Sequence, residues 1–467
     1  MSQLMRLTNK SSNEGLENFY VGDFGDKRIN VNIARAFKYM NEKETIVVKE
    51  LGGNRAREKS LWRALSNAKV QPNLISKNLA VKTNENCRNV EHVLVPFDTV
   101  EITYPEQPIK KELFGYTTNT DTKGLFLHGS TAINASNAEV LGLSSVLVWT
   151  REQCFEKGIK DKDRTIEEKE SSKWHLAAQE TKENLPAAKM LTMVGDRESD
   201  NIEYYVRTID ERTHVISRAK SDRRLSSGEN ISEKLIRLEK SYQHKILLPI
   251  TRERKVARNA EFEIKFCKVK IGYDDDKETN LTMYCVQALE IGEVPEGDER
   301  VSWVLLTSHK ITTLSKALEI LKWYSWRWVV EDVHRLMKKQ GMKIESSQCE
   351  TPHSLSNLAV LSYATAINIM VLIKARDGGK QDAKHYFDKQ ELSHLKILSN
   401  KLAGSTEKQQ NPHKICTMGW AAWVIARLGG WNCYGAKPGP AIMIRGYRSF
   451  KEISKYHTLL SEKNFVT

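Results

Sequence analysis

Residues 324–338 read YSWRWVVEDVHRLMK, and this stretch predicts a helix with two unlike faces. At 3.6 residues per turn, four of its polar side chains fall within a sector roughly 60° wide. These side chains are Tyr324, Arg327, Glu331 and Lys338. The opposite face carries the apolar side chains that such a helix buries, namely Trp326, Val329, Val330, Val333, Leu336 and Met337. A solvated surface with an ion pair between Arg327 and Glu331 would explain the polar stripe equally well.

Composition points to a folded protein with an anionic partner. The chain has 467 residues, 40% of them hydrophobic, which is enough for two to four domains with a large core. Lys plus Arg is 72 and Asp plus Glu is 59, and the net charge of +13 favours a nucleic acid as partner. A protein that is merely basic is the alternative.

The sequence predicts neither a membrane span nor a signal peptide, and its cysteines suggest no disulfide framework or zinc site. We expect no apolar run near the roughly 18 residues that span a bilayer, and the start, MSQLMRLTNKSSNEG, lacks the apolar core of a signal peptide. We therefore expect a soluble intracellular protein, located in the cytoplasm. The seven cysteines are scattered without a CxxC pair, which favours neither a disulfide framework nor a zinc site.

Residues 1–70 are predicted to form a helical domain that binds DNA ends. A Gly52–Gly53 pair marks a loop, and the helix after it carries four cations around Trp62. Cations interleaved with an aromatic side chain suit a phosphate backbone, although a solvated helix face would look the same. The cations are Arg55, Arg57, Lys59 and Arg63.

Residues 71–375 are predicted to form an α/β catalytic domain. From about residue 90, runs rich in β-branched residues alternate with helical patterns in the order strand, strand, strand, helix, strand, helix, strand. This order is that of a ribonuclease-H-like core. A β-rich insertion is expected at about 221–308, an apolar helix at 354–375, and a helical C-terminal domain at 376–467.

Three carboxylates are candidates for a metal site. Asp98 interrupts an apolar strand, where an acid is disfavoured unless it is paired or bound to a metal, and Asp196 follows the buried run MLTMV and a glycine. Glu331 lies on the polar stripe. Taken singly, they could be a turn former, a helix N-cap and half of a surface ion pair. Together they could hold two Mg²⁺ ions, which prefer oxygen ligands and promote phosphodiester displacement.

These segments give the chain a family resemblance. It resembles the DDE transposases of the IS-four insertion-sequence family, and within that family it is similar to the Tn-five transposase subgroup. The resemblance rests on FDTVEITY (97–104), EKESSKW (168–174), GDRESDN (195–201), WVLLTS (303–308), ARLGGW (426–431) and the Tyr324, Arg327, Glu331, Lys338 motif.

The resemblance implies an activity and its cofactor. Asp98, Asp196 and Glu331 would be the catalytic, metal-binding triad, holding two Mg²⁺ ions for which Mn²⁺ substitutes. The enzyme would bind the terminal inverted repeats of its element, nick the ends, form and open a hairpin, and join the ends to target DNA. A homodimer assembled on two DNA ends would cleave in trans, with 376–467 as the dimer contact.

The resemblance also implies DNA contacts. Trp303 would stack on a base flipped out of the DNA end, a contact worth about 1–3 kcal/mol. A core tryptophan is the alternative for that residue. Backbone phosphates would be contacted by Tyr324, Arg327, Lys338, Arg218 and Lys220.

Two features depart from the subgroup that the chain resembles, and they affect the finer DNA contacts rather than the catalytic class. Its start is weakly similar, and DTKGLFLH at 121–128 lacks the paired tryptophans expected there. A catalytically silent DNA-binding regulator of transposition is the main alternative. A host nuclease with the same core is weaker, because a nuclease needs neither a base-stacking tryptophan nor the polar stripe.

Overall fold

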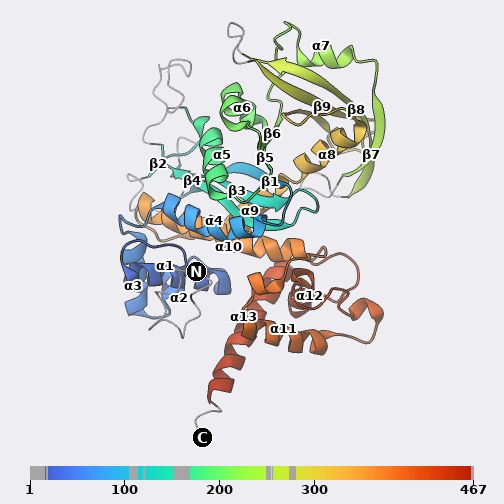
Figure 1. Ribbon diagram of the computed structural model, residues 1–467. Coiled ribbons are helices and arrows are strands. Elements are labelled where there is room, and N and C mark those ends of the chain that lie inside the picture. Colours follow the sequence, from blue (N-terminus) through green and yellow to red (C-terminus); the bar gives the residue numbers. More distant parts are fainter. Residues whose placement is uncertain are drawn as a thin grey trace. The chain divides into compact units, whose positions relative to one another are not determined.

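The computed structural model divides the chain into two compact units, each described here by itself (Figure 1). The first unit is formed by 1–86, 99–155 and 331–467, and the second by 87–98 and 156–330. The structure describes residues 16, 19–104, 114–118, 122–151, 169–248, 254, 256–272 and 280–463. The sequence-based division into 1–70, 71–375 and 376–467 stays a prediction.

The second unit is built on a mixed sheet with the strand order β1-β5-β6-β10-β9-β8-β7. The strands β1, β5 and β6 pair in parallel, and the remaining pairs are antiparallel. The bounds are β1 (Val93–Thr103), β5 (Leu191–Gly195), β6 (Thr213–Arg218), β7 (Tyr242–Leu248), β8 (Arg258–Ile271), β9 (Leu281–Ile291) and β10 (Ser302–Thr307). The predicted β insertion therefore extends the sheet, because β10 returns to pair with β6.

Helices accompany the parallel strands of this unit. Every residue of β5 is buried, as expected for a parallel strand covered on both faces. The helices are α5 (Ser172–Asn184), α6 (Ile202–Thr208), α7 (Ile231–Ile236) and α8 (Leu314–Ser325), with the 3-10 turn η6 (Arg197–Ser199). A mixed α/β fold with a large mixed sheet is thus present, and it is consistent with a ribonuclease-H-like core.

The first unit contains the other strands, and the carboxyl half of β1 lies next to β3 in it. The strands are β2 (Gly115–Tyr116), β3 (Lys123–Asn134) and β4 (Val140–Trp149). The strands β3 and β4 pair antiparallel, and the polar segment ASNAE (135–139) joins them. Of the quoted segment 121–128, Asp121 lies outside the described residues.

The apolar helix α10 (Pro352–Ala375) forms the centre of the first unit, packing on β3, β4, α1 and α12. It corrects one expectation, because it is long and apolar enough to cross a membrane by length and composition. However, 89% of its apolar window is buried inside the protein. A helix that is apolar all round is buried, and here its surroundings are the protein's own strands and helices.

Helices complete both ends of the first unit. The N-terminal ones are α1 (Lys27–Lys43), α2 (Val48–Gly52), α3 (Arg55–Leu65) and α4 (Pro72–Cys87). Those after α10 are α11 (Lys389–Leu402), α12 (Met418–Leu428) and α13 (Pro440–Lys463). The helix α3 begins after Asn54, whose side chain accepts a hydrogen bond from Arg57 N at 3.0 Å, as an N-cap should.

The prediction of one continuous helix over 324–338 is wrong. The helix α8 ends at Ser325, α9 spans Trp328–Arg335, and a π-helical turn, η8, spans Leu336–Gln340. At the junction the backbone switches to tighter bonds, with Arg327 N donating to Tyr324 O at 3.0 Å. The 60° sector calculated for a regular helix therefore does not apply. Tyr324 and Arg327 are nonetheless buried, so this part of the stripe is not a solvated surface.

Candidate active site

Asp98 and Asp196 belong to neighbouring parallel strands of the second unit and to what directly follows them. In β1 and β5, Pro96 is paired with Val194. Asp98 lies two residues further along β1, whereas Asp196 directly follows Gly195, the last residue of β5. The parallel pairing therefore brings Asp98 and the turn that carries Asp196 to the carboxyl end of β5.

The turn after β5 orients Asp196. Its Oδ1 accepts a hydrogen bond from Glu198 N at 2.9 Å and so caps η6. Gly195 lets this turn fold tightly, because a Cβ there would lie 2.3 Å from Ser199 Oγ. The N-cap expected as the alternative for Asp196 is thus present, and it fixes the carboxylate at the strand end.

Arg327 provides a positive charge beside Asp98. Its Nη1 lies 3.8 Å from Asp98 Oδ2, and its side chain is 10% exposed. The guanidinium also lies 5.9 Å from the Tyr324 ring centroid and 5.7 Å from that of Trp328. A buried guanidinium requires such partners, so Arg327 is held in place beside the carboxylate.

Aromatic side chains lie against this charged group. Trp303, half-buried on β10, packs edge-to-face on Tyr324 with ring centroids 5.7 Å apart. Burial raises the pKa of Tyr324, while the Arg327 and Arg218 cations oppose that rise. The Tyr324 hydroxyl is therefore protonated at neutral pH and can donate a hydrogen bond.

The basic strand end lies beside these rings. Arg218 Nη2 donates to Ser302 O at 3.1 Å, and Lys220 is exposed two residues further on. Six predicted site residues are thus gathered in the second unit, namely Asp98, Asp196, Arg218, Trp303, Tyr324 and Arg327.

The remaining predicted residues belong to the first unit. Glu331 is half-buried in the first turn of α9. Lys338 Nζ lies 2.8 Å from Glu101 O and 2.8 Å from Glu345 Oε1, so its charge is already held by the protein. The four cations of α3, Arg55, Arg57, Lys59 and Arg63, are all exposed.

The donor set suits a hard cation, although the described residues contain no group of three or more His, Cys, Asp or Glu arranged to hold a metal ion. Asp98 and Asp196 offer carboxylate oxygens at the carboxyl end of β5, and Mg²⁺ prefers oxygen ligands. Glu331, the third predicted carboxylate, belongs to the first unit. The role of all three residues as ligands stays a prediction.

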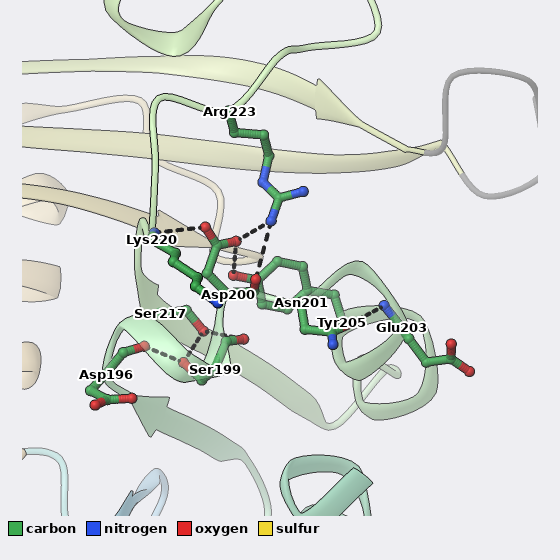
Figure 2. Close-up of polar contacts among 9 residues, drawn as sticks. All are labelled: Asp196, Ser199, Asp200, Asn201, Glu203, Tyr205, Ser217, Lys220 and Arg223. Atoms are coloured by element: carbon green, nitrogen blue, oxygen red, sulfur yellow. Dashed lines mark hydrogen bonds and ion pairs between the residues drawn. The ribbon is translucent and has the colours of Figure 1, made fainter. Parts of the chain in front are cut away.

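One buried acid near the site was not predicted. Asp200 ends the turn that begins at Asp196, and its side chain is fully buried against Arg223 (Figure 2). The segment GDRESDN was noted in the sequence, but Asp200 was given no role. A second acid four residues after the first, at the start of a helix, was the available signal.

Comparison with known proteins gives a partial family match. Residues 171–369 match the family model described as the transposase DDE domain. The match includes Asp196 and Glu331 and begins after Asp98. This stretch therefore resembles a class of metal-dependent phosphoryl-transfer enzymes that act on DNA. A cryo-EM structure of a piggyBac transposase synaptic complex with hairpin DNA aligns with a TM-score of 0.39 and 10% identity, covering 94% of this chain and 74% of that one. A likeness at this level does not assign a function.

Proposed function

We propose that this chain is a cut-and-paste DNA transposase that cleaves and joins DNA by metal-dependent phosphoryl transfer. The observation that carries the proposal is the parallel pairing of β1 with β5, which brings Asp98 and the turn that carries Asp196 to the same end of neighbouring strands. The transposase DDE match over 171–369 supports it independently.

The residues of the second unit have distinct tasks in this proposal. Asp98 and Asp196, with Glu331, would hold two Mg²⁺ ions, which supply activation of the attacking oxygen and stabilisation of the leaving oxygen. Arg327 fixes the Asp98 carboxylate from one side. The Tyr324 hydroxyl, buried beside two cations, would donate to a phosphate oxygen near the scissile bond.

Trp303 suits a stacking role in the same reaction. Its indole is held edge-on by Tyr324 yet stays partly exposed, so one face can receive an unpaired base. Stacking of this kind contributes about 1–3 kcal/mol. Arg218 and Lys220 would contact the adjoining backbone, and the exposed cations of α3 would contact DNA of the terminal repeat.

The finer assignment rests on the sequence motifs. We propose the Tn-five-like subgroup of the IS-four family, a hairpin intermediate, a homodimer on two DNA ends, and a cytoplasmic, nucleoid-associated location. The Tyr324, Arg327, Glu331, Lys338 motif and the segment ARLGGW support the subgroup.

The test is cleavage of a linear DNA that carries the inverted repeats flanking the gene, in Mg²⁺, with products resolved on a denaturing gel. Asp98→Asn, Asp196→Asn and Glu331→Gln should each reduce cleavage more than about 10³-fold while a gel shift shows end binding within about threefold of the wild type. Glu203→Gln, which removes an exposed ion pair with Arg207 on α6, is the matched control and should cleave normally. Full cleavage by any triad variant would exclude that residue from the site.

A silent regulator is the second candidate, and one observation favours it. Asp98 already lies beside the Arg327 guanidinium, and a carboxylate held by an arginine is a weaker metal ligand. Binding of the ends by the wild type without any product would support this candidate. Degradation of plain duplex without strand transfer would instead indicate a nuclease.

A further inference from the structure

Two sets of hydrogen bonds hold the chain between Asp196 and Arg223 within the second unit (Figure 2). The first set lies at the turn that carries Asp196. Ser199 Oγ donates to Asp196 O at 2.7 Å and lies 2.8 Å from Ser217 Oγ on β6. Gly195 and Ser217 are paired in the β5–β6 register, so this serine pair fastens the turn to the neighbouring strand.

Asp200 makes the second attachment. Its carboxylate is fully buried and accepts three hydrogen bonds. Oδ1 accepts from Arg223 Nη2 at 2.6 Å and from Tyr205 OH at 3.1 Å, and Oδ2 accepts from Lys220 N at 2.9 Å. Arg223 also donates to Asp200 O at 3.2 Å. One side chain thus joins the Asp196 turn to α6 and to the chain that leaves β6.

The groups that contact the Asp200 carboxylate all act as hydrogen-bond donors. Burial and the neighbouring Asp200 carboxylate raise the pKa of Tyr205 well above its ordinary value, so the tyrosine remains a donor. An arginine and a backbone N–H can only donate. Three donors therefore converge on the two carboxylate oxygens of Asp200.

We propose that Asp200 is a positioning residue for the phosphoryl-transfer site, holding the Asp196 carboxylate and the basic Arg218–Lys220 segment in one fixed relation. This inference rests on the proposed function. Asp200 does not itself contact the substrate. Asp200 fixes the end of the turn that leads into α6, while Gly195 and Ser199 fix the end that follows β5. A displacement of about 1 Å in such a group reduces the rate on the order of 10²-fold.

The decisive variant is Asp200→Asn, because asparagine has the shape of aspartate but replaces one oxygen by an NH₂ donor. At least one of the three donors would then face another donor. We expect amide hydrogen exchange in peptides covering 196–201 to rise at least about tenfold. We also expect cleavage to slow about 10–100-fold and the Mg²⁺ concentration for half-maximal cleavage to rise, with end binding unchanged.

Glu290→Gln is the matched control. Glu290 is an equally buried carboxylate of the same unit, which accepts from Arg258 Nη1 and from Val301 N. Its loss should destabilise the fold without changing exchange at 196–201 or the Mg²⁺ requirement. The same change in both variants would mean that Asp200 is merely structural, and would overturn the proposal.

Two further variants keep the test decisive. The double variant D200N/R223Q removes the uncompensated guanidinium, and its exchange at 196–201 should fall back toward that of the wild type. If Asp200→Asn does not fold, Arg223→Lys, which keeps the charge but loses the planar fork, should still raise exchange there. Exchange like that of the wild type in Arg223→Lys would refute the positioning role. A wild type that cuts no DNA would refute the proposed function, whereas the exchange result would still decide the role of Asp200.

Discussion

Replacing Glu44 by Gln should stabilise the first unit at alkaline pH. Glu44 is the C-cap of α1, with a left-handed backbone (φ 51°) and a fully buried side chain. Its Oε2 accepts from Arg448 Nη2 at 3.2 Å, but Oε1 is buried with no hydrogen-bond partner in the described part of the structure. The carboxylate also lies at the negative end of a helix. Burial raises the pKa of Glu44 to about 7, although Arg448 opposes the rise.

The magnitude follows from linkage. Each pKa unit is worth about 1.4 kcal/mol, so a rise from 4.5 to about 7 corresponds to about 3 kcal/mol. Because the pKa in the folded state is raised, the contribution of Glu44 to stability is fully present below pH 4.5 and is lost as the pH rises through 7. At pH 5 the buried Glu44 carboxyl still lowers the free energy of unfolding by about 1 kcal/mol relative to its value at low pH. Glu44→Gln cannot ionise and keeps an acceptor for Arg448.

Urea unfolding at pH 5 and pH 8, followed by tryptophan fluorescence, measures the difference. The free energy of unfolding of Glu44→Gln should exceed that of the wild type by about 2–3 kcal/mol at pH 8, and by about 1 kcal/mol or less at pH 5. Glu50→Gln, at an exposed position of α2, is the control and should show no such dependence. A gain of equal size at both pH values, or no gain at pH 8, would refute the reasoning.

Three other changes test the second unit. Gly195→Ala places a Cβ 2.3 Å from Ser199 Oγ, and a thermal melt should show destabilisation of about 1–3 kcal/mol; unchanged stability would contradict the tight turn. Burial lowers the pKa of His309 to about 2, and its Nε2 lies 2.7 Å from Thr192 Oγ1. The contribution of His309 to stability is present above pH 6.5 and is lost as the pH falls. The urea midpoint of the wild type should therefore decline between pH 7.5 and 5, and that of His309→Gln should decline less. Trp303→Ala should slow end cleavage about 10–100-fold relative to the wild type, and Trp303→Phe should slow it much less. If Trp303→Ala cleaved as fast as the wild type, the indole would be assigned to the core.

Local sequence predicted the elements that carry the first two carboxylates. A β-branched run around Asp98 and a buried run before Asp196 gave β1 and β5 correctly, because alternation and apolar runs report on burial within a few residues. The helix predicted after the Gly52–Gly53 pair is likewise present as α3, which begins at Arg55. The helix α4 was missed, since its apolar residues do not follow a single face.

The failure over 324–338 has a different origin. The pattern of polar and apolar residues is compatible with a regular helix, but the backbone changes its hydrogen bonding between Tyr324 and Trp328. That choice depends on how Tyr324 and Arg327 are buried beside Asp98 and Trp303. Periodicity does not encode contacts with such distant residues.

The sequence by itself determined strands such as β1 and β5, the candidate carboxylates and the basic, aromatic residues predicted around them. Tertiary structure alone decided that β1 pairs with β5 and brings Asp98 to the end of β5 that Asp196 follows. It also decided that β10 returns to β6 and brings Trp303 to Tyr324, and that Asp200 is buried against Arg223. The physical reason is the distance along the chain over which each effect acts. Propensity and capping act within a few residues of the chain, whereas register and the pairing of buried charges are set by groups that meet only after the chain has folded.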